Sequence, residues 1–98
     1  MAHGGWVYIL ANRRNGALYT GVTSDIAARM VQHREGKGSR FCREHGISKL
    51  VYTEEYECIE DAIAREKAIK KWRRAWKIEA IERANPHWRD LWFDIIGA

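Results

Sequence analysis

The feature that most constrains the fold is the dipeptide Asn15-Gly16, which stands between two short runs of aromatic and β-branched residues. The runs cover residues 6–11 and 18–23, and each has the length of a β-strand. An Asn-Gly pair between such runs favours a tight turn, because both residues tolerate positive φ angles. We therefore predict a β-hairpin near the start of the chain.

A third strand and a first helix are expected after this hairpin. Residues 50–56 have the composition of a strand, rich in aromatic and β-branched side chains. Ser24 can cap a helix through its hydroxyl, and Gly36 and Gly38 would end that helix. The following residues 37–48 indicate a loop or a short helical turn.

The longest helical region spans residues 60–84, which contain no Gly or Pro. Asn85-Pro86 ends it, because a residue that precedes proline disfavours the α conformation. The sequence leaves open one helix or two helices with a bend near Arg73. An apolar stripe should face the sheet, formed by Ile59, Ala62, Ile63, Ile69, Trp72 and Trp76.

The elements follow in the order β-β-α-β-α, with a further α if the long region is divided. They predict an α/β (α+β) fold in which helices pack on a three-stranded sheet, and the tail residues Trp88, Leu91 and Trp92 should fold back on it. At 98 residues and 11.4 kDa, the chain has the size of a single domain over 1–98. We expect it to be a monomer in isolation.

The start of the chain and its cysteines bear on its location. Arg13 and Arg14 follow the first apolar stretch, the reverse of a secretory signal, so we expect a cytoplasmic protein. No run of eighteen apolar residues occurs, so we expect no membrane-spanning segment. Cys42 and Cys58 are the only cysteines, which makes a disulfide scaffold an unfavourable interpretation.

The charge of the chain is basic and unevenly distributed. The net charge is +4 and the pI is about 9.3, as in many polyanion binders. Residues 65–77 carry seven bases and one acid, Glu66. We predict that these basic residues contact nucleic acid, together with two near the first helix: Lys67, Lys70, Lys71, Arg73, Arg74, Lys77, Lys37 and Arg40.

Two polar residues lie on the apolar face of the first helix. Arg29 and His33 are four residues apart, and Ile26 and Met30 share their face. The pair could be an arginine whose stem covers the core edge and a hydrogen-bonded core histidine. It could equally be functional, because arginine is seldom buried without a partner.

Glu66 stands at the centre of the stripe on the long helical region, where a carboxylate is costly unless it is paired or binds a metal. One interpretation is an i, i+4 ion pair with Lys70. Another is that Glu66 holds a hard divalent cation while the nearby bases hold phosphate, as a phosphodiesterase requires.

Tyr8 and Tyr19 point to the same face of the hairpin in either register that the turn allows. The two registers place Tyr19 opposite Asn12 or opposite Leu10. Gly21 lies on the same face and lets another group approach closely. A buried pair of structural tyrosines would also explain this pattern.

Two weaker patterns have simpler explanations. Cys42 and His45, with Cys58 and a further histidine, lack the spacing of known zinc sites. The five tryptophans could stack on nucleobases, but their helical spacing favours core packing.

Taken in order, these residues resemble a known family. Trp6-Val7-Tyr8, followed eleven residues later by Tyr19-Thr20-Gly21, resembles the paired motifs of the GIY-YIG nuclease superfamily. The resemblance continues through Arg29 and His33 on the first helix and through Glu66 on the later one. Trp6 replaces the glycine of the first motif, and Thr20 replaces the isoleucine of the second.

The resemblance covers about residues 6–92, and the stretch 85–91 is similar to the end of small single-domain bacterial members. It implies a central three-stranded antiparallel sheet in the order β-β-α-β-α-α. It also implies a metal-dependent endonuclease that hydrolyses phosphodiester bonds in DNA, in repair or processing. RNA is compatible with the same contacts.

The resemblance assigns a role to each site residue. Glu66 would be the sole protein ligand of Mg²⁺ or Mn²⁺. Tyr8 or Tyr19 would orient or deprotonate the attacking water. Arg29 would hold the scissile phosphate, and His33 would assist as hydrogen-bond donor or proton relay. We expect these five side chains to converge on one concave face.

Two positions depart from the pattern of repair-type members. Val22 stands where they carry a lysine, and Ile78 stands where they carry an asparagine. Lys70 or Asn85 could supply the missing contacts. The alternatives are therefore a nucleic-acid-binding module with weak or no catalysis, or a small interaction protein in which Glu66 and Arg29 simply pair.

Overall fold

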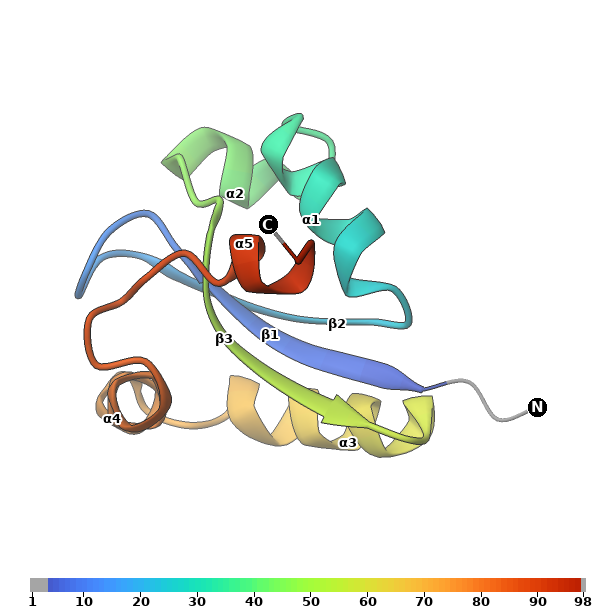
Figure 1. Ribbon diagram of the computed structural model, residues 1–98. Coiled ribbons are helices and arrows are strands. Elements are labelled where there is room, and N and C mark those ends of the chain that lie inside the picture. Colours follow the sequence, from blue (N-terminus) through green and yellow to red (C-terminus); the bar gives the residue numbers. More distant parts are fainter. Residues whose placement is uncertain (1–3, 98) are drawn as a thin grey trace.

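The computed structural model describes residues 4–97 and has the α+β architecture that the sequence predicts (Figure 1). Its elements in chain order are β1 (Gly5–Ala11), β2 (Leu18–Thr23), α1 (Ile26–Arg34), α2 (Arg40–His45), β3 (Lys49–Tyr56), α3 (Ile59–Lys70), α4 (Arg74–Ala84) and α5 (Trp92–Ile95). The short helices α2 and α5 add to the expected order without changing it. None of the helices within residues 4–97 is both long enough and apolar enough to cross a membrane.

The sheet has the order β2-β1-β3, and both pairings of the central strand β1 are antiparallel. Side chains alternate along a strand, so β1 contributes to two cores. Val7 and Ile9 pack with residues of α3 and α4, whereas Tyr8 and Leu10 pack with residues of α1 and α2. Figure 1 shows the same division, with α1, α2 and α5 on one face and α3 and α4 on the other.

The hairpin forms, but its turn is not a two-residue Asn15-Gly16 loop. Tyr19 pairs with Leu10, the second of the two registers considered above. The Gly16 N–H donates to the Arg13 carbonyl at 2.9 Å, so the turn centres on Arg14-Asn15. The Asn12 side chain accepts a hydrogen bond from the Ala17 N–H at 2.9 Å next to this turn. Asn15 adopts the positive φ of 57° expected of an Asn in a turn.

The first helix is capped by Asp25, so the expectation that Ser24 caps it is wrong. The Asp25 carboxylate accepts a hydrogen bond from the Ala28 N–H at 3.0 Å. The Asp25 N–H is itself held by the Thr23 hydroxyl at 3.1 Å, which fixes the entry into the helix. Gly36, with φ of 76°, follows its end as expected.

The long helical region is two helices, with the break at residues 71–73. Because of this break, the apolar stripe does not continue along a single helix. Ala62 and Ile69 are fully buried as expected, but Ile63 is 37% exposed and Trp76 is 48% exposed. The prediction that Ile63 and Trp76 face the sheet is therefore wrong.

The tail after α4 folds back onto the body, as predicted. Trp88 is fully buried in the core beside α3, and Trp92 packs against the core beside α1. Between them, the Leu91 N–H donates to the Leu50 carbonyl at 2.7 Å, so the tail crosses the free edge of β3. The tail thus joins the two helical layers around the β3 edge of the sheet.

Candidate active site

Three of the predicted residues form one aromatic cluster. The Tyr8 hydroxyl lies 3.1 Å from Nε2 of His33, within hydrogen-bond distance. The Tyr19 ring lies 6.4 Å from the Tyr8 ring and 5.7 Å from the His33 ring, between centroids. Tyr8 and His33 are buried, whereas Tyr19 is half-buried and connects the cluster to the surface.

Two glycines make room for this cluster. Gly21 pairs with Tyr8 across the sheet, and a Cβ atom at Gly21 would lie only 2.5 Å from the Tyr8 hydroxyl oxygen. The phenol ring therefore lies across the edge strand β2. Gly38 does the same for His33, because a Cβ there would lie 2.5 Å from Nδ1. The sequence does not reveal this role of Gly38, because a glycine at that position indicates only the end of a helix.

The environment of the cluster favours neutral side chains. Burial raises the pKa of Tyr8 well above that of free tyrosine, and the negative charge that Tyr19 could carry raises it further. Burial lowers the pKa of His33 below its ordinary value, and the positive charge of Arg29 lowers it further. Tyr8 is therefore a phenol, and His33 a neutral imidazole, at neutral pH.

The hydrogen bonding of His33 is incomplete. Nε2 meets the Tyr8 hydroxyl, but Nδ1 is buried and has no hydrogen-bond partner within residues 4–97. If Nε2 is the unprotonated nitrogen, it accepts the Tyr8 proton and frees the phenol oxygen to accept a hydrogen bond from another molecule. His33 can in this way orient the Tyr8 hydroxyl and leave its oxygen free to act as an acceptor.

Arg29 lies one turn before His33 on α1 and is half-buried. It forms no ion pair among the residues that the structure describes. Residues four apart on a helix share a face, so Arg29 lies on the same face of α1 as His33, and its positive charge lowers the pKa values of both Tyr8 and His33. A guanidinium without a carboxylate partner is suited to bind phosphate.

Glu66 lies on α3, and its carboxylate pairs with Lys70 Nζ at 2.6 Å. The residue is 8% exposed, whereas the Lys70 side chain is 52% exposed. The i, i+4 ion pair, the first of the two interpretations of Glu66, is therefore formed. Glu66 does not pair with Arg29. The alternative of a small interaction protein in which these two residues pair therefore loses its basis.

The convergence of all five side chains on one concave face stays a prediction, because Glu66 and the other four residues come from different layers. α3 packs against the Val7 side of β1, and Tyr8 and α1 occupy the other side. The edge strand β2 contacts α3 and also carries Gly21 beneath the Tyr8 ring. Burial is the largest cause of the raised pKa of Tyr8, and the charge of Glu66 is a minor one.

The predicted basic residues differ in how much of their charge is available. Arg74 donates to the carbonyls of Asn15 and Gly16, both at 2.6 Å, and so holds the hairpin loop. The other engaged residues are Lys70 with Glu66, Arg40 with Glu44, and Arg73 over the Trp76 ring. The exposed residues Lys67, Lys71 and Lys37 form no ion pair within the described chain, residues 4–97.

The departures from the family pattern are filled by packing. Val22 and Ile78 are half-buried against the core that includes α3. Asn85 is 4% exposed, and its amide donates to the Val51 and Arg89 carbonyls. Asn85 is thus committed to the tail and does not supply the missing contact. No three His, Cys, Asp or Glu residues among 4–97 gather to hold a metal, so these residues form no zinc site.

The sequence model of the GIY-YIG catalytic domain matches residues 4–79. The chain belongs to the GIY-YIG family. GIY-YIG domains form a nuclease superfamily, and the resemblance drawn from the two tyrosine motifs is confirmed. In this GIY-YIG domain the motifs lie side by side on β1 and β2, with Tyr8 opposite Gly21.

Relatives of this GIY-YIG protein occur among bacterial UPF0213 proteins. One from Staphylococcus epidermidis is 36% identical over 77 residues, which cover 79% of this chain and 93% of the relative. One from Staphylococcus haemolyticus has the same identity and coverage. The solution NMR structure of a UPF0213 protein from Bacillus halodurans is 30% identical, with a TM-score of 0.56. The match covers 89% of this chain and 92% of that one.

Proposed function

We propose that this protein is an endonuclease that hydrolyses phosphodiester bonds in DNA with a divalent cation, Mg²⁺ or Mn²⁺, in DNA repair or processing. The observation that carries the proposal is the contact between the Tyr8 hydroxyl and His33, with the unpaired guanidinium of Arg29 beside it. These groups can activate water and hold a phosphate, which are the two tasks of phosphodiester hydrolysis.

The residues present fit a hydrated divalent cation at Glu66. Mg²⁺ keeps several waters and needs only one or two carboxylates, so the single buried carboxylate is a sufficient donor set. The ion-pair partner of Glu66 is a half-exposed lysine, which can turn to solvent when a cation arrives. The cation would supply positive charge at the phosphate and make a nearby water more acidic.

The remaining steps belong to the protein side chains. The attacking water would donate its proton to the Tyr8 oxygen as the Tyr8 proton passes to Nε2 of His33. This relay leaves Tyr8 neutral, which suits a buried phenol whose pKa is raised. It makes His33 an imidazolium, which would return the proton through Tyr8 to the oxygen that leaves as its bond to phosphorus breaks. Arg29 would bind the scissile phosphate and stabilise the negative charge that develops on it. Tyr19 would position the water at the surface of the cluster.

Glu66→Gln tests the proposal most directly, because it removes the charge at nearly constant volume. We expect plasmid nicking in Mg²⁺ to fall by orders of magnitude while DNA binding holds or rises. The midpoint of thermal unfolding should change little, because Lys70 can reach solvent once its partner is gone.

Glu55→Gln is the matched control, since Glu55 is an exposed carboxylate on β3 outside the cluster, and it should nick like the wild type. Normal nicking by Glu66→Gln would show that the metal role is wrong. So would a lowered midpoint of thermal unfolding that Mg²⁺ changes as much as it changes that of the wild type. Persistent DNA binding without any wild-type nicking would instead favour a binding module with lost catalysis.

A further inference from the structure

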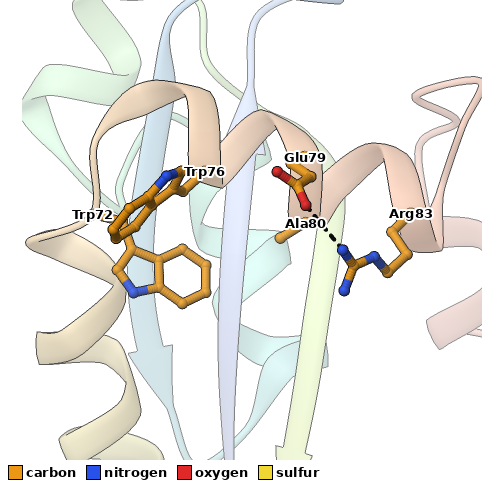
Figure 2. A pocket seen from close by; sticks show the side chains of 5 residues that line it. All are labelled: Trp72, Trp76, Glu79, Ala80 and Arg83. Carbon is orange, nitrogen blue, oxygen red and sulfur yellow. Dashed lines mark hydrogen bonds and ion pairs between the residues drawn. The ribbon is translucent and has the colours of Figure 1, made fainter.

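An aromatic groove lies along α4, apart from the cluster around Tyr8. It has a volume of about 370 Å³ and is lined by Trp72, Trp76, Glu79, Ala80 and Arg83 (Figure 2). Trp72 belongs to the break between α3 and α4, and the other four residues lie on α4. Figure 2 shows the two indoles at one end of the groove and the Glu79–Arg83 pair at the other.

Neither indole of the groove is fully buried in the core. Trp76 is 48% exposed and Trp72 is half-buried, whereas Trp88 on the same side of the sheet is fully buried. The Trp72 and Trp76 rings meet edge to face, with centroids 6.5 Å apart and planes at 76°. The expectation that the tryptophans serve core packing therefore holds for Trp88 and is wrong for Trp76.

Arginines surround these rings. The Arg65 guanidinium lies 4.9 Å from the Trp72 ring centre, and that of Arg73 lies 4.8 Å from the centre of Trp76. Residues 65–77 carry seven bases and one acid, Glu66. Glu66 is paired with Lys70, and Arg65 is paired with Glu54 of β3 at 3.0 Å, so the remaining bases supply the free positive charge. A flat aromatic surface within a cationic stretch favours a ligand that is both aromatic and anionic.

We propose that this groove binds an unpaired nucleobase of the nucleic-acid substrate, an inference that rests on the proposed function. A base within a duplex has both faces covered by its neighbours, so only an unpaired base can stack on Trp76. Glu79 and Arg83 offer an acceptor and donors to the edge of that base. Their mutual ion pair, at 2.9 Å and largely exposed, costs little to rearrange.

The position of the groove suits the same nucleic-acid strand that reaches the catalytic residues. Glu66 lies one turn before the end of α3, and Trp72 follows two residues after that end. Lys67 and Lys71, which follow Glu66 and precede Trp72 in the sequence, are exposed and can contact phosphates. The substrates that the groove favours are therefore those with an unpaired segment beside the cleaved bond.

The test measures DNA binding by the intact protein in the absence of divalent cations. Three labelled probes are compared: a blunt duplex, the same duplex with a single-stranded extension, and the same extension built from abasic nucleotides. The variant is Trp76→Ala, with Trp76→Phe as the conservative replacement. Phe93→Ala is the matched control, because Phe93 is an exposed aromatic residue on α5 outside the groove.

We expect the wild type to bind the extended duplex more tightly than the blunt or abasic probe. Trp76→Ala should lose about tenfold in affinity for the extended probe, as expected for one lost base stack, and nothing for the blunt probe. Trp76→Phe should retain most of the affinity, and Phe93→Ala should retain all of it.

The inference is overturned if Trp76→Ala binds all probes like the wild type or weakens them equally. It is also overturned if the abasic extension binds as well as the normal one, since phosphate contacts alone would then explain binding. A dimer that Trp76→Ala converts to monomer would assign the groove to a second copy of the chain. Wild-type protein that neither binds nor nicks any DNA would refute the proposed function itself, a result distinct from these.

Discussion

Tyr8 shows how the chemistry of one residue depends on side chains that its neighbours lack. Its phenol reaches over the edge strand because residue 21 is glycine, and it meets His33, which itself fits only because residue 38 is glycine. The burial that follows holds Tyr8 and His33 neutral. When Tyr8 passes its proton to His33, the charge forms on the imidazole and not on the phenol, and the lowered pKa of His33 favours the return of that proton.

The lowered pKa of His33 predicts a pH dependence of stability. The unfolded chain takes up a proton on this residue near its ordinary pKa of 6.5, whereas the folded chain resists it. The contribution of His33 is thus fully present above that value and is lost as the pH falls through the folded pKa. We expect the unfolding midpoint to fall on acidification from about pH 7 to about pH 5, and to fall less in His33→Gln.

His87→Gln is the control for the pH dependence, because His87 is exposed and far along the chain, and it should keep the wild-type dependence. Thermal unfolding followed by circular dichroism across the pH range provides the measurement. Identical pH dependence in the wild type and His33→Gln would contradict the assignment of a buried neutral imidazole.

At the scale of elements, the break between α3 and α4 divides the basic stretch by task. Lys67 and Lys71 at the end of α3 are exposed and form no ion pair within residues 4–97. Arg74 at the start of α4 instead holds two carbonyls of the hairpin loop. Side chains that are close in sequence therefore have structural and binding roles that charge alone does not separate.

This division predicts different outcomes for two variants. Lys67→Glu combined with Lys71→Glu should weaken DNA binding uniformly across sequences. The slope of the logarithm of the binding constant against the logarithm of the salt concentration should become about two units less steep, since each phosphate contact contributes about one. Arg74→Gln should lower the unfolding midpoint by a few degrees and change the slope less. Binding titrations over a range of salt concentrations, beside thermal unfolding, measure both. A double variant with the wild-type slope would show that the lysines only face solvent.

At the scale of the whole molecule, the tail after α4 fastens the two helical layers together. Asn85 donates to the Val51 carbonyl at 3.1 Å, and its own side-chain carbonyl accepts from the Arg89 N–H at 3.0 Å. The next turn places Asp90 against the Leu50 N–H, and Arg34 of α1 pairs with the same carboxylate. One short segment thereby covers the start of β3 and connects it to both cores.

Asn85→Ala should destabilise the protein without altering its chemistry. It leaves the buried Val51 carbonyl without this donor, a loss of about 2 kcal/mol. For a chain of this size we expect the unfolding midpoint to fall by about 10 °C. Asn12→Ala, at an exposed loop hydrogen bond, should cost less. Nicking by the folded variant at low temperature should be unchanged, and a loss of nicking at unchanged stability would restore Asn85 as a site residue.

The sequence by itself determined the local features of this protein. Strand and helix positions follow from alternation and helical periodicity, which depend on neighbouring residues, and so does the common face of Tyr8 and Tyr19. The order of the two tyrosine motifs, the Arg29–His33 spacing and Glu66 are sufficient to identify the family from the sequence.

Only the tertiary structure decided how these features meet. The structure has the hairpin register with Tyr19 opposite Leu10, one of the two that the sequence allows, and the exposure of Trp76 depended on where α3 ends. The placement of Glu66 on the other layer from Tyr8, with Lys70 as its partner, followed from which face of the sheet α3 covers. These outcomes arise from contacts between residues distant in sequence, whose free energies local patterns do not contain.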